Sequence, residues 1–213
     1  MPILGIDVYE GDVANAPLQI GTARQNGVAF LFAKASEGDD HMDSAYKNIR
    51  TQVATAGGVL FGAYHFFRPG VDPIAQANFF LQTASIVSGD LRPMLDVEPE
   101  NGVNPDPQAA LACYNQIQSQ LGIYPWLYSG ADFSLNNLIG LFDAGPIWLA
   151  RYIFSDPVAY YTANQSNNFY QTVPWPDMWQ YTDKDVIQGE PAPLDGDLFL
   201  GSLADLQNFH IVP

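Results

Sequence analysis

The sequence predicts an α/β fold, a single irregular TIM-like (β/α) barrel with mostly parallel strands. Short apolar runs alternate with amphipathic stretches along the whole chain, and the runs are apolar on both faces. Strands of this kind belong in a parallel sheet that is covered by helices. About eight strands in 213 residues indicate a closed barrel that is small for its class, where roughly 250 residues are typical.

The predicted strands recur at regular intervals from the N-terminus. Their apolar runs span residues 3–8, 29–36, 59–67, 93–98, 123–130, 146–152 and 177–182, with a last strand that begins at about residue 197. An open doubly wound sheet is the alternative architecture. It would need a glycine-rich phosphate loop after the first strand, and the segment DVYEGDV is not such a loop.

Helices are predicted between the strands from their start and stop signals. They fall in residues 18–27, 42–57, 72–87, 107–122 and 131–139, with a short one after residue 202. Asp72 precedes Pro73 as a helix N-cap would, and Ser202 and Asp205 have the spacing of a capping box. Residues 153–180 are rich in Asn, Tyr and Pro, so we expect this stretch to replace at least one regular helix.

Charge and hydropathy argue against several classes of protein. The net charge of −15 at pH 7 argues against a nucleic-acid ligand and against binding to an anionic membrane surface. No apolar run is as long as a transmembrane helix, so we expect no membrane insertion. The N-terminal segment MPILGIDVYEG has no basic region followed by an apolar one and therefore predicts no secretory signal peptide.

The single cysteine, Cys113, allows no intramolecular disulfide. It neighbours the apolar stripe formed at helical spacing by Ala110, Tyr114, Ile117 and Leu121. No histidine lies near it in the chain, so we expect a core residue rather than a nucleophile.

Polar side chains follow nearly every predicted strand. In a parallel barrel the active site lies at the carboxyl ends of the strands, and acids at this end of several separate strands are hard to explain as solvated surface. In chain order the candidates are Asp7, Glu37, Tyr64, His65, Asp96, Glu98, Tyr128, Arg151, Tyr152, Gln180, Tyr181, Asp195 and Asp197.

The segment RPMLDVEPENG places Asp96 and Glu98 two residues apart at the end of an apolar run. Residues at this spacing share one face of a strand, so we expect both carboxyls at the barrel mouth, with Glu98 nearer the rim. Two enclosed carboxyls cannot both ionise easily, so one pKa should rise and leave a proton donor beside a charged partner. This is the division of labour of glycoside hydrolysis. The alternative is an ion pair of these acids with Lys34 or Arg151.

Several motifs occur in a fixed order between Gly5 and about Gly201, namely GIDVYEGD, FAKASEG, GAYHFFRP, PMLDVE, WLARY and MWQYTD. Together they resemble the muramidases of glycoside hydrolase family 25. The resemblance implies an irregular β/α barrel with a groove at the C-terminal ends of its strands. It also implies lysozyme activity, the cleavage of peptidoglycan between N-acetylmuramic acid and N-acetylglucosamine.

The resemblance further implies roles for individual residues. Glu98 is the expected general acid, and Asp96 is expected to orient or charge the 2-acetamido group of the substrate, with retention of configuration as the outcome. Asp7 and Asp195 would complete the acidic floor. Glu37, Tyr64, His65, Tyr128 and Gln180 would be residues of the groove. Arg151, Tyr152 and Tyr181, which follow predicted strands, complete the set of expected substrate-binding residues.

The sequence also departs from the pattern of the family. Tyr9 and Glu10 stand where a serine and a longer loop are usual, and KASEG replaces a form with threonine. Near the C-terminus, LDGDLFLG stands where Asp-x-Asn is usual, so Asp197 occupies the place of the asparagine. The central pair of carboxyls remains.

Two other classes of function stay open. A non-catalytic glycan-binding barrel would explain an aromatic-rich rim, although such a module would usually lack the acid, and Glu98 is present. A metal-dependent deacetylase would need paired ligands, and His41, His65 and His210 do not have that spacing. We therefore expect no metal and no cofactor.

The expected organisation is a single catalytic barrel domain over residues 1–213, with no separate wall-binding module. We expect a monomer whose partner is the glycan strand of bacterial peptidoglycan. Such an enzyme acts on the bacterial cell wall, either as a phage lysin released by lysis or as a secreted enzyme whose signal has been removed.

Overall fold

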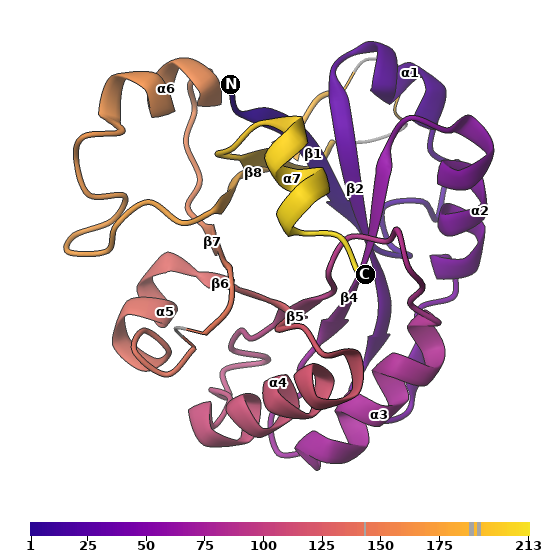
Figure 1. The fold of residues 1–213 in the computed structure, drawn as a ribbon, viewed down its shortest axis with the longest axis vertical. Helices are drawn as coiled ribbons and strands as arrows, with labels where there is room; N and C mark the ends of the chain where they lie inside the picture. Colours follow the sequence, from indigo (N-terminus) through magenta and orange to yellow (C-terminus); the bar gives the residue numbers. More distant parts are fainter. Residues whose placement is uncertain (143, 188–189, 191–192) are drawn as a thin grey trace.

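The structure is a computed structural model that describes residues 1–142, 144–187, 190 and 193–213. In this part of the chain a nine-stranded sheet has the order β1-β9-β8-β7-β6-β5-β4-β2-β3, and the pairing of β1 with β2 closes it into a barrel (Figure 1). The predicted α/β barrel is confirmed. Its strands are β1 (Ile3–Val8), β2 (Val28–Glu37), β3 (His41–Met42), β4 (Leu60–Phe66), β5 (Met94–Asp96), β6 (Trp126–Gly130), β7 (Ile147–Ala150), β8 (Met178–Asp185) and β9 (Leu194–Phe199).

The strands are parallel in the described residues, with two exceptions. The two-residue β3 is antiparallel to β2, and β9 runs antiparallel to both of its neighbours, β1 and β8. Residues 186–193 are the whole connection from β8 to β9. A parallel pairing needs a crossover of about a dozen residues or more, so this short connection permits only an antiparallel neighbour.

Most helices lie outside the strands, whereas α7 crosses one end of the barrel (Figure 1). Their bounds are α1 (Ile20–Gln25), α2 (Tyr46–Ala56), α3 (Pro73–Ala84), α4 (Pro107–Leu121), α5 (Ala131–Asn137), α6 (Pro157–Asn164) and α7 (Leu203–Phe209). Two predicted start signals are confirmed. The Asp72 side chain accepts hydrogen bonds from the backbone of Ile74 and Ala75, and Ser202 and Asp205 form a capping box.

Three elements differ from the prediction. The hairpin strand β3 was not predicted, and β5 ends at Asp96, so Glu98 lies two residues beyond the strand. Residues 153–180 do contain a helix, α6, although the segment that follows it up to β8 is irregular. Asp156 caps α6 by accepting from the backbone of Ala159, and Pro157 fills its first turn. This is the same Asp-Pro signal that starts α3 and α4.

The barrel interior is filled by aromatic rings rather than left open. Phe32 packs edge-on against Trp148 with ring centroids 4.9 Å apart. Phe30 and Phe32 occupy space that two glycines leave free. A Cβ atom at Gly5 would lie 2.1 Å from the Phe30 ring, and one at Gly62 would lie 2.3 Å from the Phe32 ring. The core therefore blocks any passage through the barrel and confines a site to its rim.

The C-terminal segment covers the end of the barrel at which the parallel strands begin. Leu206 of α7 packs among the interior rings, and the His210 ring stacks on Trp126 with centroids 4.6 Å apart. On the outer side of the strands, Cys113 of α4 is fully buried, which confirms it as a core residue.

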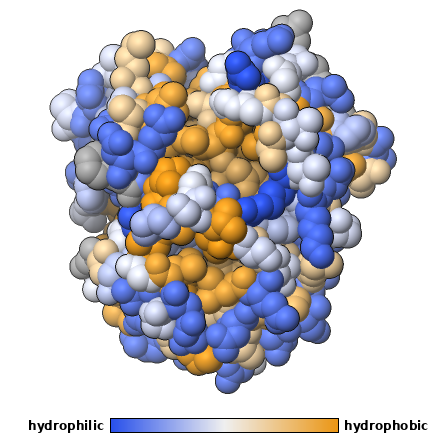
Figure 2. Space-filling model, turned by 45° about the vertical axis from the view of Figure 1, so that its right-hand side comes forward, coloured by the Kyte–Doolittle hydropathy of each residue, from blue (hydrophilic) through white to orange (hydrophobic). Residues whose placement is uncertain are grey.

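The outer surface is largely hydrophilic, with hydrophobic residues gathered towards the middle of the face in Figure 2. Within the described residues, every helix is too short or too polar to cross a membrane.

The filled interior predicts a large difference between two phenylalanine truncations. Phe32→Ala should lower the free energy of unfolding by about 3–5 kcal/mol, because it leaves a cavity beside Trp148. Phe154→Ala should change it by less than about 0.5 kcal/mol, because this side chain is fully exposed. Guanidinium denaturation of both variants measures the contrast, and equal losses would contradict the packing described for the barrel.

Candidate active site

A group of carboxyls lies at the mouth of the barrel, the end opposite α7. Asp7 comes from the end of β1 and Asp96 from the end of β5, and Glu98 follows β5. Asp195 and Asp197 come from the beginning of β9. They reach the same mouth because β9 is antiparallel, and its register places Asp195 directly opposite Asp7.

Asp7, Asp96 and Asp197 are buried, and Glu98 and Asp195 are partly buried. None of the five forms an ion pair among the described residues, although the charge of Lys34 acts on Asp96. Asp197 is 0 % exposed, Asp7 6 % and Asp96 7 %. Lys34 pairs instead with Glu37, and the Arg151 guanidinium donates to the carbonyl of Phe169. The alternative reading of Asp96 and Glu98 as ion-pair partners of Lys34 or Arg151 is therefore wrong for the described residues.

Gln180 of β8 joins the acids to two tyrosines. Its side-chain carbonyl oxygen accepts from the Tyr128 hydroxyl at 2.7 Å and from the Tyr152 hydroxyl at 3.0 Å. Its amide nitrogen donates to Asp7 at 2.7 Å and, at 3.4 Å, to Asp195. Carboxylates only accept, so the acids fix which way the amide points, and the amide then fixes both hydroxyls.

Burial raises the pKa of each of these acids. It raises the pKa of Asp7 to about 7, against the hydrogen bond from Gln180, and that of Asp195 to about 8, with the nearby Asp7 adding to the shift. Burial and then the charge of Glu98 raise the pKa of Asp96, and burial raises the pKa of Glu98 against a backbone N–H from Gly130. The pKa of both members of the central pair is raised, and the pair loses its protons in two coupled steps. Between those steps one carboxyl is an acid and the other a carboxylate.

The sequence pattern that defines Glycosyl hydrolases family 25 matches residues 6–190, which is most of the chain and includes Asp7, Asp96 and Glu98. The chain belongs to glycosyl hydrolase family 25. This membership makes it a glycoside hydrolase, and it confirms the resemblance carried by the ordered motifs.

Relatives and solved structures agree with the family 25 assignment. Protein YegX of Escherichia coli K12 is 32 % identical over 97 % of this chain and 73 % of its own length. Lysozyme M1 of Streptomyces globisporus is 25 % identical over 96 % of this chain and 70 % of its own. The structure of a muramidase from Trichobolus zukalii is 25 % identical, with a TM-score of 0.78 over 96 % of this chain and 97 % of the other.

Four of the eight residues predicted to bind substrate lie near the carboxyls of the family 25 site, namely Tyr64, Tyr128, Tyr152 and Gln180. Tyr64 faces into the barrel from β4, and Asp7 and Asp96 are among the charges that act on its hydroxyl after burial in raising its pKa. Tyr128, Tyr152 and Gln180 form the network described above. Glu37 lies at the end of β2, where burial would raise its pKa but hydrogen bonds from Lys34 and Arg68 lower it overall.

Three predicted residues point away from the mouth. His65 of β4 is fully buried on the outer face of the barrel strands. Its Nδ1 lies 2.9 Å from Ser36 Oγ, and burial lowers its pKa to about 3. The Arg151 side chain extends to Phe169, which lies in the irregular segment between α6 and β8. The Tyr181 hydroxyl donates to Asp185 at 2.5 Å on the outer side of β8. The structure does not bring these three side chains to the carboxyl cluster.

Asp12 is an acid near the family 25 site that the strand-end rule missed. Its charge raises the pKa of Asp7 and of Asp195, after the effect of burial on each. It lies in the loop after β1, four residues past the strand. A search of whole loops rather than strand ends would have found it.

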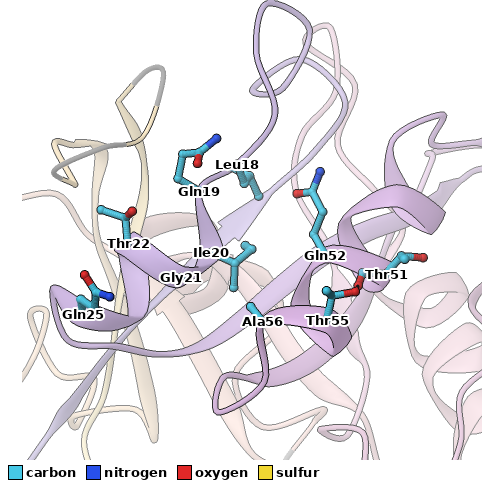
Figure 3. Close-up of a pocket in the computed structure, with 10 residues that line it drawn as sticks. All are labelled: Leu18, Gln19, Ile20, Gly21, Thr22, Gln25, Thr51, Gln52, Thr55 and Ala56. Carbon is cyan, nitrogen blue, oxygen red and sulfur yellow. The ribbon is translucent and has the colours of Figure 1, made fainter.

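A separate depression of about 460 Å³ lies on the flank of the barrel between α1 and α2 (Figure 3). Ten residues line it, all of them glutamine, threonine, glycine or aliphatic residues, and none has a titratable side chain. It offers no acid or base and is distinct from the carboxyl site. Among the described residues, no group of three or more His, Cys, Asp or Glu side chains is arranged to hold a metal ion.

The raised pKa values predict how stability depends on pH. Folded Asp7 and Asp195 hold protons up to about pH 7 and 8, whereas the unfolded chain has released them from about pH 4. The folded state therefore binds more protons, and the free energy of unfolding should fall as pH rises from 7 to 8. Histidines contribute little in this window because they are mainly neutral in both states.

Urea denaturation at several pH values across that window measures the slope. Asp195→Asn removes one of the two groups and should make the slope shallower. A stability that is constant or rises with pH in the wild type would contradict the protonation described for the site.

Proposed function

We propose that this family 25 glycosidase is an N-acetylmuramidase that hydrolyses the β-1,4 bond between N-acetylmuramic acid and N-acetylglucosamine in peptidoglycan. The observation that carries the proposal is the Asp96 and Glu98 pair, which lies at the mouth without an ion-pair partner among the described residues. The relatives named lysozyme and muramidase support the choice of substrate.

Glu98 acts as the general acid in this proposal. It is the more exposed member of the pair and lies beyond the end of β5, where a polymer crossing the mouth would pass. Burial raises its pKa, which is the direction that a proton donor requires. Glu98 gives this proton to the glycosidic oxygen as the bond from the anomeric carbon to that oxygen breaks.

Asp96 assists the anomeric centre through the acetamido group of the substrate. Its Oδ1 has no hydrogen-bond partner among the described residues, so it can accept from the acetamido N–H. The acetamido oxygen then attacks the anomeric carbon from the face opposite the leaving group. Water opens the resulting ring while Glu98 takes its proton, and two inversions give net retention.

The groove and the organisation of the enzyme follow from the same geometry. Asp7 and Asp195 form the acidic floor, and Tyr64, Tyr128 and Tyr152 present hydroxyls and ring faces to the sugar. All of these residues come from one chain, so the proposal places catalysis in a single barrel domain that acts as a monomer on the bacterial cell wall.

Replacement of the acid tests this proposal. Purified peptidoglycan is digested with wild type and with Glu98→Gln, the products are reduced, and the new ends are identified by mass spectrometry. Muramic acid should be found at the new reducing ends with the wild type. The variant should lose at least about 100-fold in rate, because general acid catalysis typically contributes that much or more.

Glu100→Gln is the matched control, since this glutamate lies two residues further along and outside the carboxyl cluster. It should digest peptidoglycan at the rate of the wild type. N-acetylglucosamine at the new ends would overturn the bond specificity. Binding without new ends from any of the proteins would instead favour a non-catalytic glycan-binding barrel.

A further inference from the structure

Asp197 is a buried carboxyl whose surroundings hold no positive charge. It is 0 % exposed, and neither of its carboxyl oxygens has a hydrogen-bond partner among the described residues. It faces Asp7 on β1, Asp195 on its own strand and Trp148 on β7, and its register partner on β8 is Gln180. Burial and the charges of Asp7 and Asp195 raise the pKa of Asp197, and they outweigh the opposing effect of the Trp148 indole N–H. An ionised carboxylate is costly to bury without a cation, so these surroundings favour the neutral acid.

A protonated Asp197 could donate a hydrogen bond to the carboxyl of Asp7. The two residues lie on paired strands, where Gly5 is opposite Asp197 and Asp7 is opposite Asp195. Burial raises the pKa of Asp7, and the interaction with Asp197 opposes that effect. Two ionised carboxylates are both acceptors and repel each other, whereas a single proton between them makes a strong hydrogen bond.

We propose that Asp197 is a positioning residue that stays protonated during catalysis and donates a hydrogen bond to Asp7. In its ionised form, Asp7 then accepts from Asp197 and from Gln180, whose carbonyl oxygen accepts from Tyr128 and Tyr152. The proton on Asp197 thus fixes a chain of hydrogen bonds that ends at two hydroxyls of the groove. Asp197 itself is sealed from substrate. The inference deepens the proposed function and rests on it.

Two substitutions of similar size show whether the side chain at position 197 must donate a hydrogen bond or must carry a charge. Asp197→Asn keeps a donor towards Asp7 without charge, and its kcat on peptidoglycan should stay within about threefold of wild type. Asp197→Leu removes the donor and should lower kcat by about tenfold or more with little change in KM. It should also move the acid limb of the kcat profile to higher pH, because Asp7 loses an interaction that lowers its pKa.

An infrared measurement tests the proton without using activity. The difference spectrum between wild type and Asp197→Asn at pH 7 should contain the carbonyl band of a protonated carboxylic acid. Absence of that band would overturn the proposal even if the Leu variant fails to fold. An Asn variant as inactive as Glu98→Gln would also overturn it, because the charge would then be required. If the wild type releases no muramic acid ends, the proposed function fails while the infrared result still decides the state of Asp197.

Discussion

The double pairing of β1 is the constraint on which the barrel and its site both depend. This strand is parallel to β2 on one side and antiparallel to β9 on the other, and without it the sheet would stay open. The same register sets Asp7 opposite Asp195 and Gly5 opposite Asp197. A slip of one residue would turn every side chain of β1 to the other face, so the geometry of the floor is as well specified as the closure itself.

The aromatic interior explains why the acids interact so strongly. Trp148 and the rings of β2 and β4 lie directly below the carboxyls, and α7 closes the far end against water. Charges above such an apolar interior are poorly screened, so an ionised acid raises the pKa of the acids beside it. The fold tolerates this repulsion by keeping protons on some of the acids. The same few carboxyl side chains therefore determine both how stability depends on pH and how protons are transferred at the site.

Much of this arrangement could be predicted from the sequence, and the residues wrongly assigned to the groove share one physical cause. The alternation of apolar runs gave the barrel, and the strand-end rule found Asp7, Asp96 and Gln180. In three places, however, two neighbouring polar residues were both assigned to the groove, and only one of each pair faces it. The inward members are Tyr64, Tyr152 and Gln180, and the outward members are His65, Arg151 and Tyr181. A strand that is buried on both faces shows no alternation, so its pattern cannot tell which parity points inward.

The position of Cys113 has a consequence for where the protein can work. The thiol is fully buried in the packing between α4 and the sheet, and burial raises its pKa, so little reactive thiolate is present. With no second cysteine in the chain, no internal disulfide has to form for the fold to be complete. The same native state is therefore compatible with a reducing compartment during synthesis and with an oxidising one afterwards. Passage from one to the other requires no change in covalent structure.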